Sequence, residues 1–115
     1  MHKKIIIPKV LCLIGSELYN SLTELKDYLN FSLLICEDLL NNSSHLEYEA
    51  VLIEAESLKS EIKKFINLNN NKPKLLLCHS NKFKNINYNE VMSFPINLIE
   101  LNNKILKIIA ANQFV

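Results

Sequence analysis

The 115-residue sequence contains no arginine and no tryptophan, and all 13 of its basic residues are lysines. Arginine carries the planar guanidinium that recognises phosphates and guanine edges through paired hydrogen bonds. The lysines are balanced by 12 acidic residues, so the formal net charge is only +1. No bulk positive field therefore draws the chain toward an anionic partner. Direct recognition of nucleic acid by this chain is not expected.

Glycine is also nearly absent, since Gly15 is the only one. A nucleotide-binding Rossmann-like protein needs several glycines in its phosphate loop, so that backbone amides approach the anion closely. Here Gly15 is followed by Ser16 and by Glu17, whose carboxylate repels phosphate. The sequence therefore disfavours a nucleotide-binding protein, and no cofactor is expected.

Cysteines are few and long apolar runs are missing. Cys12, Cys36 and Cys78 lie within or beside short apolar runs without a CxxC spacing, which predicts buried, reduced thiols. The N-terminal run 3–7 is too short for a signal peptide, and no run reaches the length of a membrane span. We expect a cytoplasmic protein with no membrane association.

Short apolar runs alternate with amphipathic segments along the whole chain. Runs of this kind, ended by polar or turn residues, are typical of strands that are covered on both faces. Strands are predicted over 10–14, 31–36, 50–53, 75–78 and 90–93. Helices are predicted over 16–29, 39–47 and 58–66, and after Asn97. Ser16 is the expected N-cap of the first helix, and Asn97 with Glu100 predicts a capping box for the last.

This alternation predicts a single α/β domain, 1–115 with a core over 9–112, built as a doubly wound five-stranded parallel sheet. In such open sheets, functional residues lie at the carboxyl ends of the strands. The residues at these ends are Ile14 and Gly15, Glu37 and Asp38, Glu54, Cys78 and His79, and Phe94 and Pro95.

From Lys9 to Asn112, this order of elements and strand ends resembles the receiver domain of two-component response regulators. That family has an acidic pair after the first strand, a phosphorylated Asp ending the third, a Thr or Ser ending the fourth and a Lys-Pro dipeptide after the fifth. The corresponding residues here are, in that order, Ile14 and Gly15, Glu54, Cys78, and Phe94 with Pro95. Only the proline is kept. The resemblance implies the strand order 2-1-3-4-5, a fourth helix shortened to fit 81–89 and a cis Phe94–Pro95 bond.

The replaced residues remove the groups on which receiver phosphorylation depends. A divalent cation needs several oxygen ligands to neutralise the transferring phosphoryl group, and Ile14 and Gly15 supply no side-chain oxygen. Phe94 cannot pair with a phosphoryl group as the family's lysine does. Cys78 replaces the hydroxyl that couples phosphorylation to movement. We therefore expect neither a metal site nor an enzyme, and regard all these positions as degenerate.

Glu54 and His79 each allow more than one interpretation. The longer Glu54 carboxylate can mimic a phosphorylated Asp, or it can simply accept hydrogen bonds from loop amides or pair with lysines. Together with Glu37 and Asp38 it can offer oxygens to an adventitious cation, although acids at a helix start are favoured by the helix dipole alone. His79, beside Cys78, is either a surface residue or part of a metal, pH-sensitive or nucleophilic site.

The last helix carries more apolar residues than one sheet needs. Ile99 and Leu106 widen the apolar arc to about half of the circumference, beyond the residues that suffice for a core stripe: Leu98, Leu101, Ile105, Ile108 and Ile109. We assign a partner surface to Ile99, Leu106 and Ile109. The alternative is that the C-terminal residues or the short fourth helix cover this arc internally.

These observations predict a phosphorylation-independent, receiver-like regulatory domain that dimerises through its last helix. It would form the N-terminal part of a transcription regulator and act on an attached effector domain. The alternative is a stand-alone adaptor or inhibitor that binds a histidine kinase or a phosphotransfer protein. A dimer favours the first interpretation, and a monomer that captures a kinase favours the second.

Overall fold

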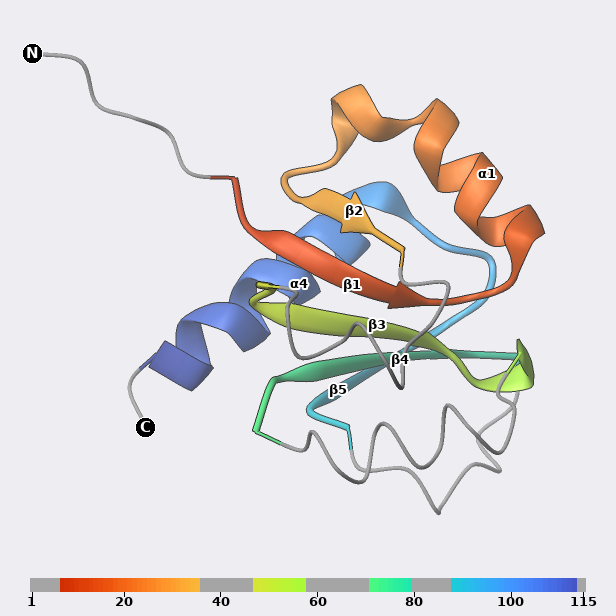
Figure 1. Ribbon diagram of the computed structural model, residues 1–115. Coiled ribbons are helices and arrows are strands. Elements are labelled where there is room, and N and C mark those ends of the chain that lie inside the picture. The colour runs from red at the N-terminus through yellow and green to blue at the C-terminus, as the bar shows by residue number, and fades with distance from the viewer. Residues whose placement is uncertain (1–6, 36–46, 58–70, 80–87, 114–115) are drawn as a thin grey trace, which may run out of the picture.

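A computed structural model of the chain describes residues 7–35, 47–57, 71–79 and 88–113 (Figure 1). Several predicted features lie outside these residues: the helix over 58–66, the shortened helix within 81–89, nearly all of the helix over 39–47, and the side chains of Cys36, Glu37 and Asp38.

The five strands form one parallel sheet in the order β2-β1-β3-β4-β5. The strands are β1 (Lys9–Leu13), β2 (Ser32–Leu34), β3 (Ala50–Glu54), β4 (Lys74–Cys78) and β5 (Glu90–Ser93). Both the parallel sheet and its strand order confirm the prediction. The chain therefore has the doubly wound α/β architecture, with β1, β3 and β4 in the middle of the sheet (Figure 1).

The central strands are apolar at nearly every position because both of their faces are buried. Side chains of a strand alternate between the two faces, and the buried residues divide accordingly into two clusters. One face carries Val10, Cys12, Ala50, Leu52, Leu75 and Leu77. The other carries Leu11, Leu13, Val51, Ile53, Leu76 and Cys78. Continuous apolar runs, rather than alternating ones, are what such a sheet requires.

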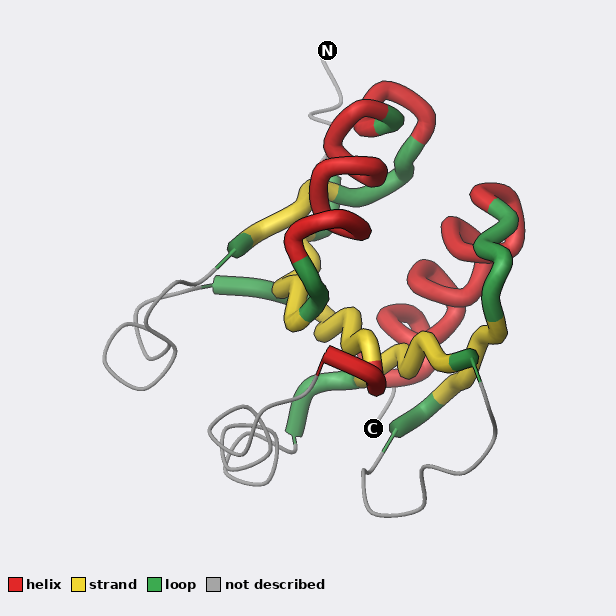
Figure 2. The backbone as a smooth tube through the Cα atoms, turned by 90° about the vertical axis from the view of Figure 1, so that its right-hand side faces the viewer, coloured by secondary structure: helices red, strands yellow, loops and turns green. Residues whose placement is uncertain are grey.

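Two helices, α1 (Ser16–Glu24) and α4 (Leu98–Gln113), cover the same face of the sheet (Figure 2). Short 3-10 turns follow α1 and β3, namely η1 (Lys26–Tyr28) and η3 (Ala55–Ser57). The α1 and α4 residues in the first buried cluster are Leu22, Leu101, Ile105, Ile108 and Ile109. Among the described residues, no helix is long and apolar enough to cross a bilayer.

The first helix begins and ends differently from the prediction. Gly15, and not Ser16, is the N-cap, because the Tyr19 N–H already bonds to the Gly15 carbonyl. The helix also ends at Glu24, well before Leu29. The Leu25 N–H bonds to the Leu22 carbonyl, three residues back, and this tighter turn leads into η1. Leu25 consequently leaves the core stripe and is 37% exposed.

Smaller corrections concern the strands and the last helix. β1 starts and ends one residue earlier than predicted, so Ile14 lies beyond the strand, and β2 is confined to Ser32–Leu34. Asn97 Oδ1 accepts the Glu100 N–H as predicted, but the Glu100 carboxylate pairs with Lys104 instead of completing a capping box. The assignment of Ile109 to a partner surface is wrong, because this side chain is only 8% exposed and packs in the core.

Lys74, the first residue of β4, is buried although it carries an amine. Its side chain is 3% exposed, and its Nζ donates to the Lys72 carbonyl at 2.9 Å. Burial lowers the pKa of Lys74 below its ordinary 10.5, because the interior disfavours the charged form. The unfolded chain therefore binds more protons than the folded chain at pH values between the two pKa values. Burying the charged amine lowers the free energy of unfolding. This destabilisation is complete at pH values below the folded-state pKa, and it disappears as the pH rises through that pKa toward 10.5.

We predict that Lys74→Met stabilises the protein by about 1 kcal/mol at pH 7, since it removes the cost of burying a polar group. The difference from the wild type should shrink as the pH rises toward 10.5, because the wild-type amine loses its proton below that ordinary pKa. Urea denaturation of both proteins across this range measures the effect. Lys26→Met, at an exposed position, is the matched control and should show no such pH-dependent difference. A constant advantage of Lys74→Met at every pH would contradict the assignment.

Candidate functional site at the carboxyl edge of the sheet

The strand register places the degenerate receiver positions at one edge of the sheet. Glu54 ends β3 next to Leu77 of β4, and Cys78 ends β4 next to Ser93 of β5. Ile14 follows β1, is partly buried and packs against the first buried cluster. Gly15 is the next residue. Phe94 and Pro95 follow β5, and the bond between them is cis, as the resemblance implied.

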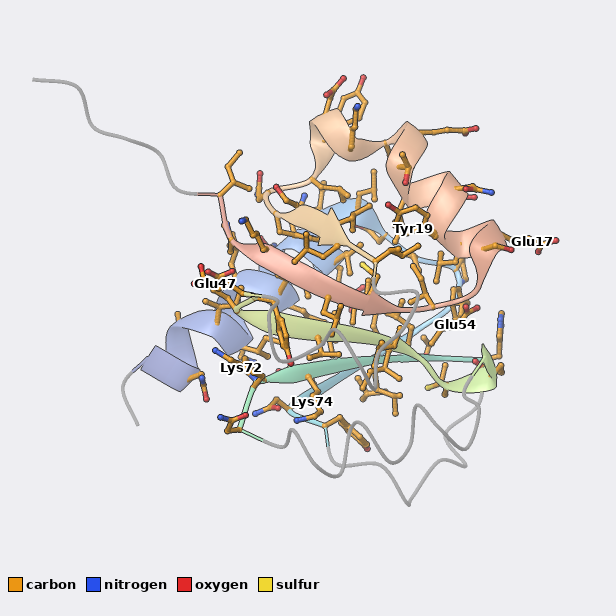
Figure 3. All side chains as sticks on the ribbon, in the orientation of Figure 1. Glu17, Tyr19, Glu47, Glu54, Lys72 and Lys74 are labelled. Carbon is orange, nitrogen blue, oxygen red and sulfur yellow. The ribbon has the colours of Figure 1, made fainter. Side chains whose placement is uncertain are left out.

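The Glu54 carboxylate binds the backbone of the neighbouring strand end. Its Oε1 accepts the Gly15 N–H at 2.7 Å, across 39 residues of sequence, and Figure 3 shows Glu54 beside the ends of β1 and β3. Hydrogen bonds to an ionised carboxylate are shorter and stronger than neutral ones. Gly15 is in an extended conformation (φ −68°, ψ 159°), which orients its N–H toward β3 and its carbonyl into α1.

A second carboxylate makes a similar contact one strand further along the sheet. Glu56, in η3, accepts the His79 N–H at 2.7 Å through its Oε1. The His79 ring in turn stacks on Phe94, with ring centroids 4.1 Å apart and an interplanar angle of 16°. The ends of β3, β4 and β5 are thus joined by one hydrogen bond and one aromatic contact. Sequence reasoning named His79 and Phe94 but not their stacking, and it missed Glu56.

The two described cysteines are free thiols and are buried, as predicted. Burial raises the pKa of Cys12 to about 12. Burial also raises the pKa of Cys78, and the negative charge of Glu56 adds to this effect. A thiolate is the reactive form of cysteine, so neither group is poised as a nucleophile at neutral pH.

The described residues of this edge do not supply the oxygen ligands of the divalent cation that phosphorylated receivers require. Ile14 and Gly15 contribute no side-chain oxygen, and Gly15 instead directs a hydrogen-bond donor at the Glu54 carboxylate. Such cations prefer several oxygen ligands. Here the Gly15 N–H, a hydrogen-bond donor, faces the carboxylate where a further oxygen ligand would be needed. Within the described ranges, no three His, Cys, Asp or Glu side chains form a cluster that could hold a metal ion.

Comparison with solved structures identifies the fold. The receiver domain of an HD domain-containing protein from Pseudomonas fluorescens matches with a TM-score of 0.74 at 17% identity, covering 94% of this chain and 98% of that one. A response regulator receiver domain protein from Methanospirillum hungatei matches with a TM-score of 0.71 at 14% identity, covering 94% and 98%. A two-component response regulator from Clostridium difficile gives 0.66 at 20% identity, covering 90% and 96%.

These likenesses, together with the strand order, show that the chain has the receiver fold of two-component response regulators. No protein-family model matches the sequence, and no curated protein matches it.

The Glu54 to Gly15 contact yields a stability prediction. Glu54→Ala should cost about 1–3 kcal/mol, the range for losing a hydrogen bond to a charged group, whereas Glu54→Gln keeps an acceptor oxygen and should cost less. Urea denaturation measures both, and hydrogen exchange of the Gly15 amide should accelerate in the Ala variant. Glu24→Ala, at an exposed position in the last turn of α1, is the control. Unchanged Gly15 exchange in Glu54→Ala would show that the contact does not protect this amide.

Proposed function

We propose that this chain is a phosphorylation-independent, receiver-like regulatory and dimerisation domain. It acts in the cytoplasm as the N-terminal part of a response-regulator-type transcription regulator, and it controls a DNA-binding effector domain. The observation that carries the proposal is the hydrogen bond between Gly15 N–H and the Glu54 carboxylate at the position where related receivers are phosphorylated.

The chemistry of the strand ends supports independence from phosphorylation. Phosphoryl transfer to a carboxylate requires that oxygen to attack, with a cation beside it to neutralise charge. At Glu54 one carboxylate oxygen is engaged by a backbone donor. The position of the family's lysine is taken by Phe94, whose ring packs on His79. An aromatic stack offers no positive charge to a phosphoryl group, so the domain works as a binding module and not as an enzyme.

The same contact supports a domain that is held in one state. In a phosphorylated receiver, the added negative oxygens draw loop groups toward the end of the third strand. Here the Glu54 side chain already holds the loop after β1 through Gly15. The regulatory signal therefore reaches the domain through the presence, amount or partner of the protein, and not through its covalent modification.

The surface of α4 supports dimerisation. Ile99 is 73% exposed and Leu106 is 39% exposed, and both lie on this one helix. Exposed large apolar side chains that gather on one surface are typical of protein interfaces. A dimer brings two effector domains together, as a transcription regulator that binds paired DNA half-sites requires.

We predict that amide NMR spectra show no saturable shifts at Gly15, Glu54 or Cys78 when Mg²⁺ and then beryllofluoride, a phosphoryl mimic, are added. The reason is that the described oxygen donors are too few and Glu54 is already engaged. Saturable shifts at these residues would overturn phosphorylation independence. A chain that is monomeric at all concentrations and captures a histidine kinase would favour the adaptor function instead.

A rebuilt site provides the positive control for this titration. The variant carries the family's residue types at the degenerate positions: Ile14→Asp, Gly15→Asp, Glu54→Asp, Cys78→Thr and Phe94→Lys. It should respond to Mg²⁺ and beryllofluoride, whereas Glu54→Asp alone should not. A response of the single variant would mean that the remaining residues suffice for the chemistry.

A further inference from the structure

Three exposed apolar residues belong to α4 and η1, two elements that one buried polar residue joins. Ile99 is 73% exposed, Tyr28 is 71% exposed and Leu106 is 39% exposed, whereas Asn102 is only 8% exposed. Ile99 and Leu106 lie three residues before and four residues after Asn102, and positions with these spacings are neighbours on a helix surface. Tyr28 belongs to η1. We call Tyr28, Ile99 and Leu106 the α4–η1 patch.

Asn102 brings the two elements of this patch together. Its Nδ2 donates to the Tyr28 carbonyl at 2.9 Å, and its Oδ1 accepts the Asn30 N–H at 2.8 Å. Both ends of one amide thus bind the backbone on either side of Leu29, 72 to 74 residues away in sequence. This fixes η1 against α4 and brings the backbone at Tyr28 next to Asn102, whose helix carries the exposed stripe.

The other flank of α4 is charged and faces β5. Lys107 Nζ lies 2.6 Å from Glu90 Oε1, and Lys104 Nζ lies 3.5 Å from Glu90 Oε2. Lys104 also lies 3.9 Å from Glu100. Two lysines thus share Glu90, whose pKa is lowered by the Lys107 hydrogen bond and by the charge of Lys104. The flank therefore has an excess positive charge at Lys107 and an exposed negative charge at Glu100.

A shallow groove of about 380 Å³ runs along this flank, beside the exposed stripe. It is lined by Asn97, Ile99, Glu100, Asn103, Lys104 and Lys107. Within this groove Glu100 and Lys107 lie near opposite ends along the helix axis, with Lys104 between them. A helix that fits this groove must therefore present the opposite charges in the opposite order.

We propose that the occupant is a second copy of α4, packed antiparallel about a two-fold axis that passes between Asn102 and Asn103. This arrangement places Ile99 of each copy opposite Leu106 of the other, because both are 3.5 positions from the axis. Glu100 and Lys107 of opposite copies are then offset by two residues, about 3 Å along the helix, within reach of a lysine side chain. The surface is thus complementary to itself in both shape and charge.

The interface must extend beyond one helix, and η1 provides the extension. Stable interfaces bury about 800 Å² on each partner, more than Ile99 and Leu106 supply alone. Tyr28 adds a large aromatic side chain at the edge of the stripe, of the kind enriched at interfaces. The dimer therefore extends from the groove on α4 toward η1. This inference rests on the proposed dimerisation and specifies its surface.

Sedimentation of the intact chain over a series of concentrations tests the patch. Ile99→Asn and Tyr28→Asn should each raise the dimer dissociation constant about tenfold or more, since each removes an apolar contact of the interface. Ile35→Asn, at a position 47% exposed just beyond the end of β2, is the matched control and should leave the constant unchanged. Dimers of undiminished affinity in both patch variants would overturn the inference and leave dimerisation itself intact.

Charge reversal tests the two-fold arrangement independently of the apolar contacts. Glu100→Lys opposes two lysines across the interface, and Lys107→Glu opposes two acids, so each variant alone should dimerise more weakly than the wild type. Mixed together, the two variants should form a heterodimer, because both cross-interface pairs then have opposite charges. Circular dichroism shows whether each variant remains folded. Failure of the mixture to restore association would refute the antiparallel arrangement.

A cysteine at the proposed axis separates this inference from the proposed function. Asn103→Cys in a Cys36→Ser background should form a disulfide-linked dimer under mild oxidation, whereas Ser93→Cys at the end of β5 should not. Efficient cross-linking through Ser93→Cys alone would support dimerisation and overturn the α4–η1 surface. A chain that sediments as a monomer at every concentration would overturn both, while the beryllofluoride result would still test phosphorylation independence.

Discussion

The hydrogen bond from the Gly15 N–H to the Glu54 carboxylate is the contact on which the functional edge depends. It joins the ends of two neighbouring buried strands, and it sets the conformation of the residue from which α1 begins. A phosphorylatable Asp at this position would need its oxygens free for a cation and for the phosphoryl group. Lengthening the side chain by one methylene lets the carboxylate reach a backbone donor instead. At this position the carboxylate therefore connects the ends of two strands.

The edge has also changed from a charged cluster to a packed one. Where related receivers carry a lysine, Phe94 lies flat against His79 at a centroid distance of 4.1 Å. Stacked rings exclude water and contribute roughly 0.5–1.5 kcal/mol beyond the area they bury. Glu56 anchors the backbone of His79 from the other side. Two hydrogen bonds to carboxylates and one aromatic stack thus hold the described strand ends together.

Much of the fold follows directly from the sequence, because the buried strands leave a local signal. The run from Ala50 to Ile53 is apolar at every position, and only a strand covered on both faces needs this. The contacts of the site left no such signal. Glu54 and Gly15 are 39 residues apart, and nothing in either neighbourhood specifies that a carboxylate meets an amide rather than a lysine.

The same limit explains the errors at the helices. The leucine spacing after Ser16 continues smoothly to Leu29, so a periodicity argument extends the helix past its real end at Glu24. The residue that stabilises the interruption is Asn102, which binds the backbone at Tyr28 and Asn30 from a different helix. Ile109 was misassigned for a related reason. The helical period identifies a wide apolar arc, but it does not show which positions of that arc are buried by the rest of the protein and which are exposed.

These long-range polar contacts connect the carboxyl edge of the sheet to the proposed interface. Gly15 is held by Glu54 and caps α1, α1 leads directly into η1, and η1 is held by Asn102 of α4. Each link is a hydrogen bond or a single short helix, so the position of Tyr28 depends on where α1 starts. All of these contacts form within the unmodified chain, and we infer that the proposed dimer surface is therefore assembled on folding, without a signal at the strand ends.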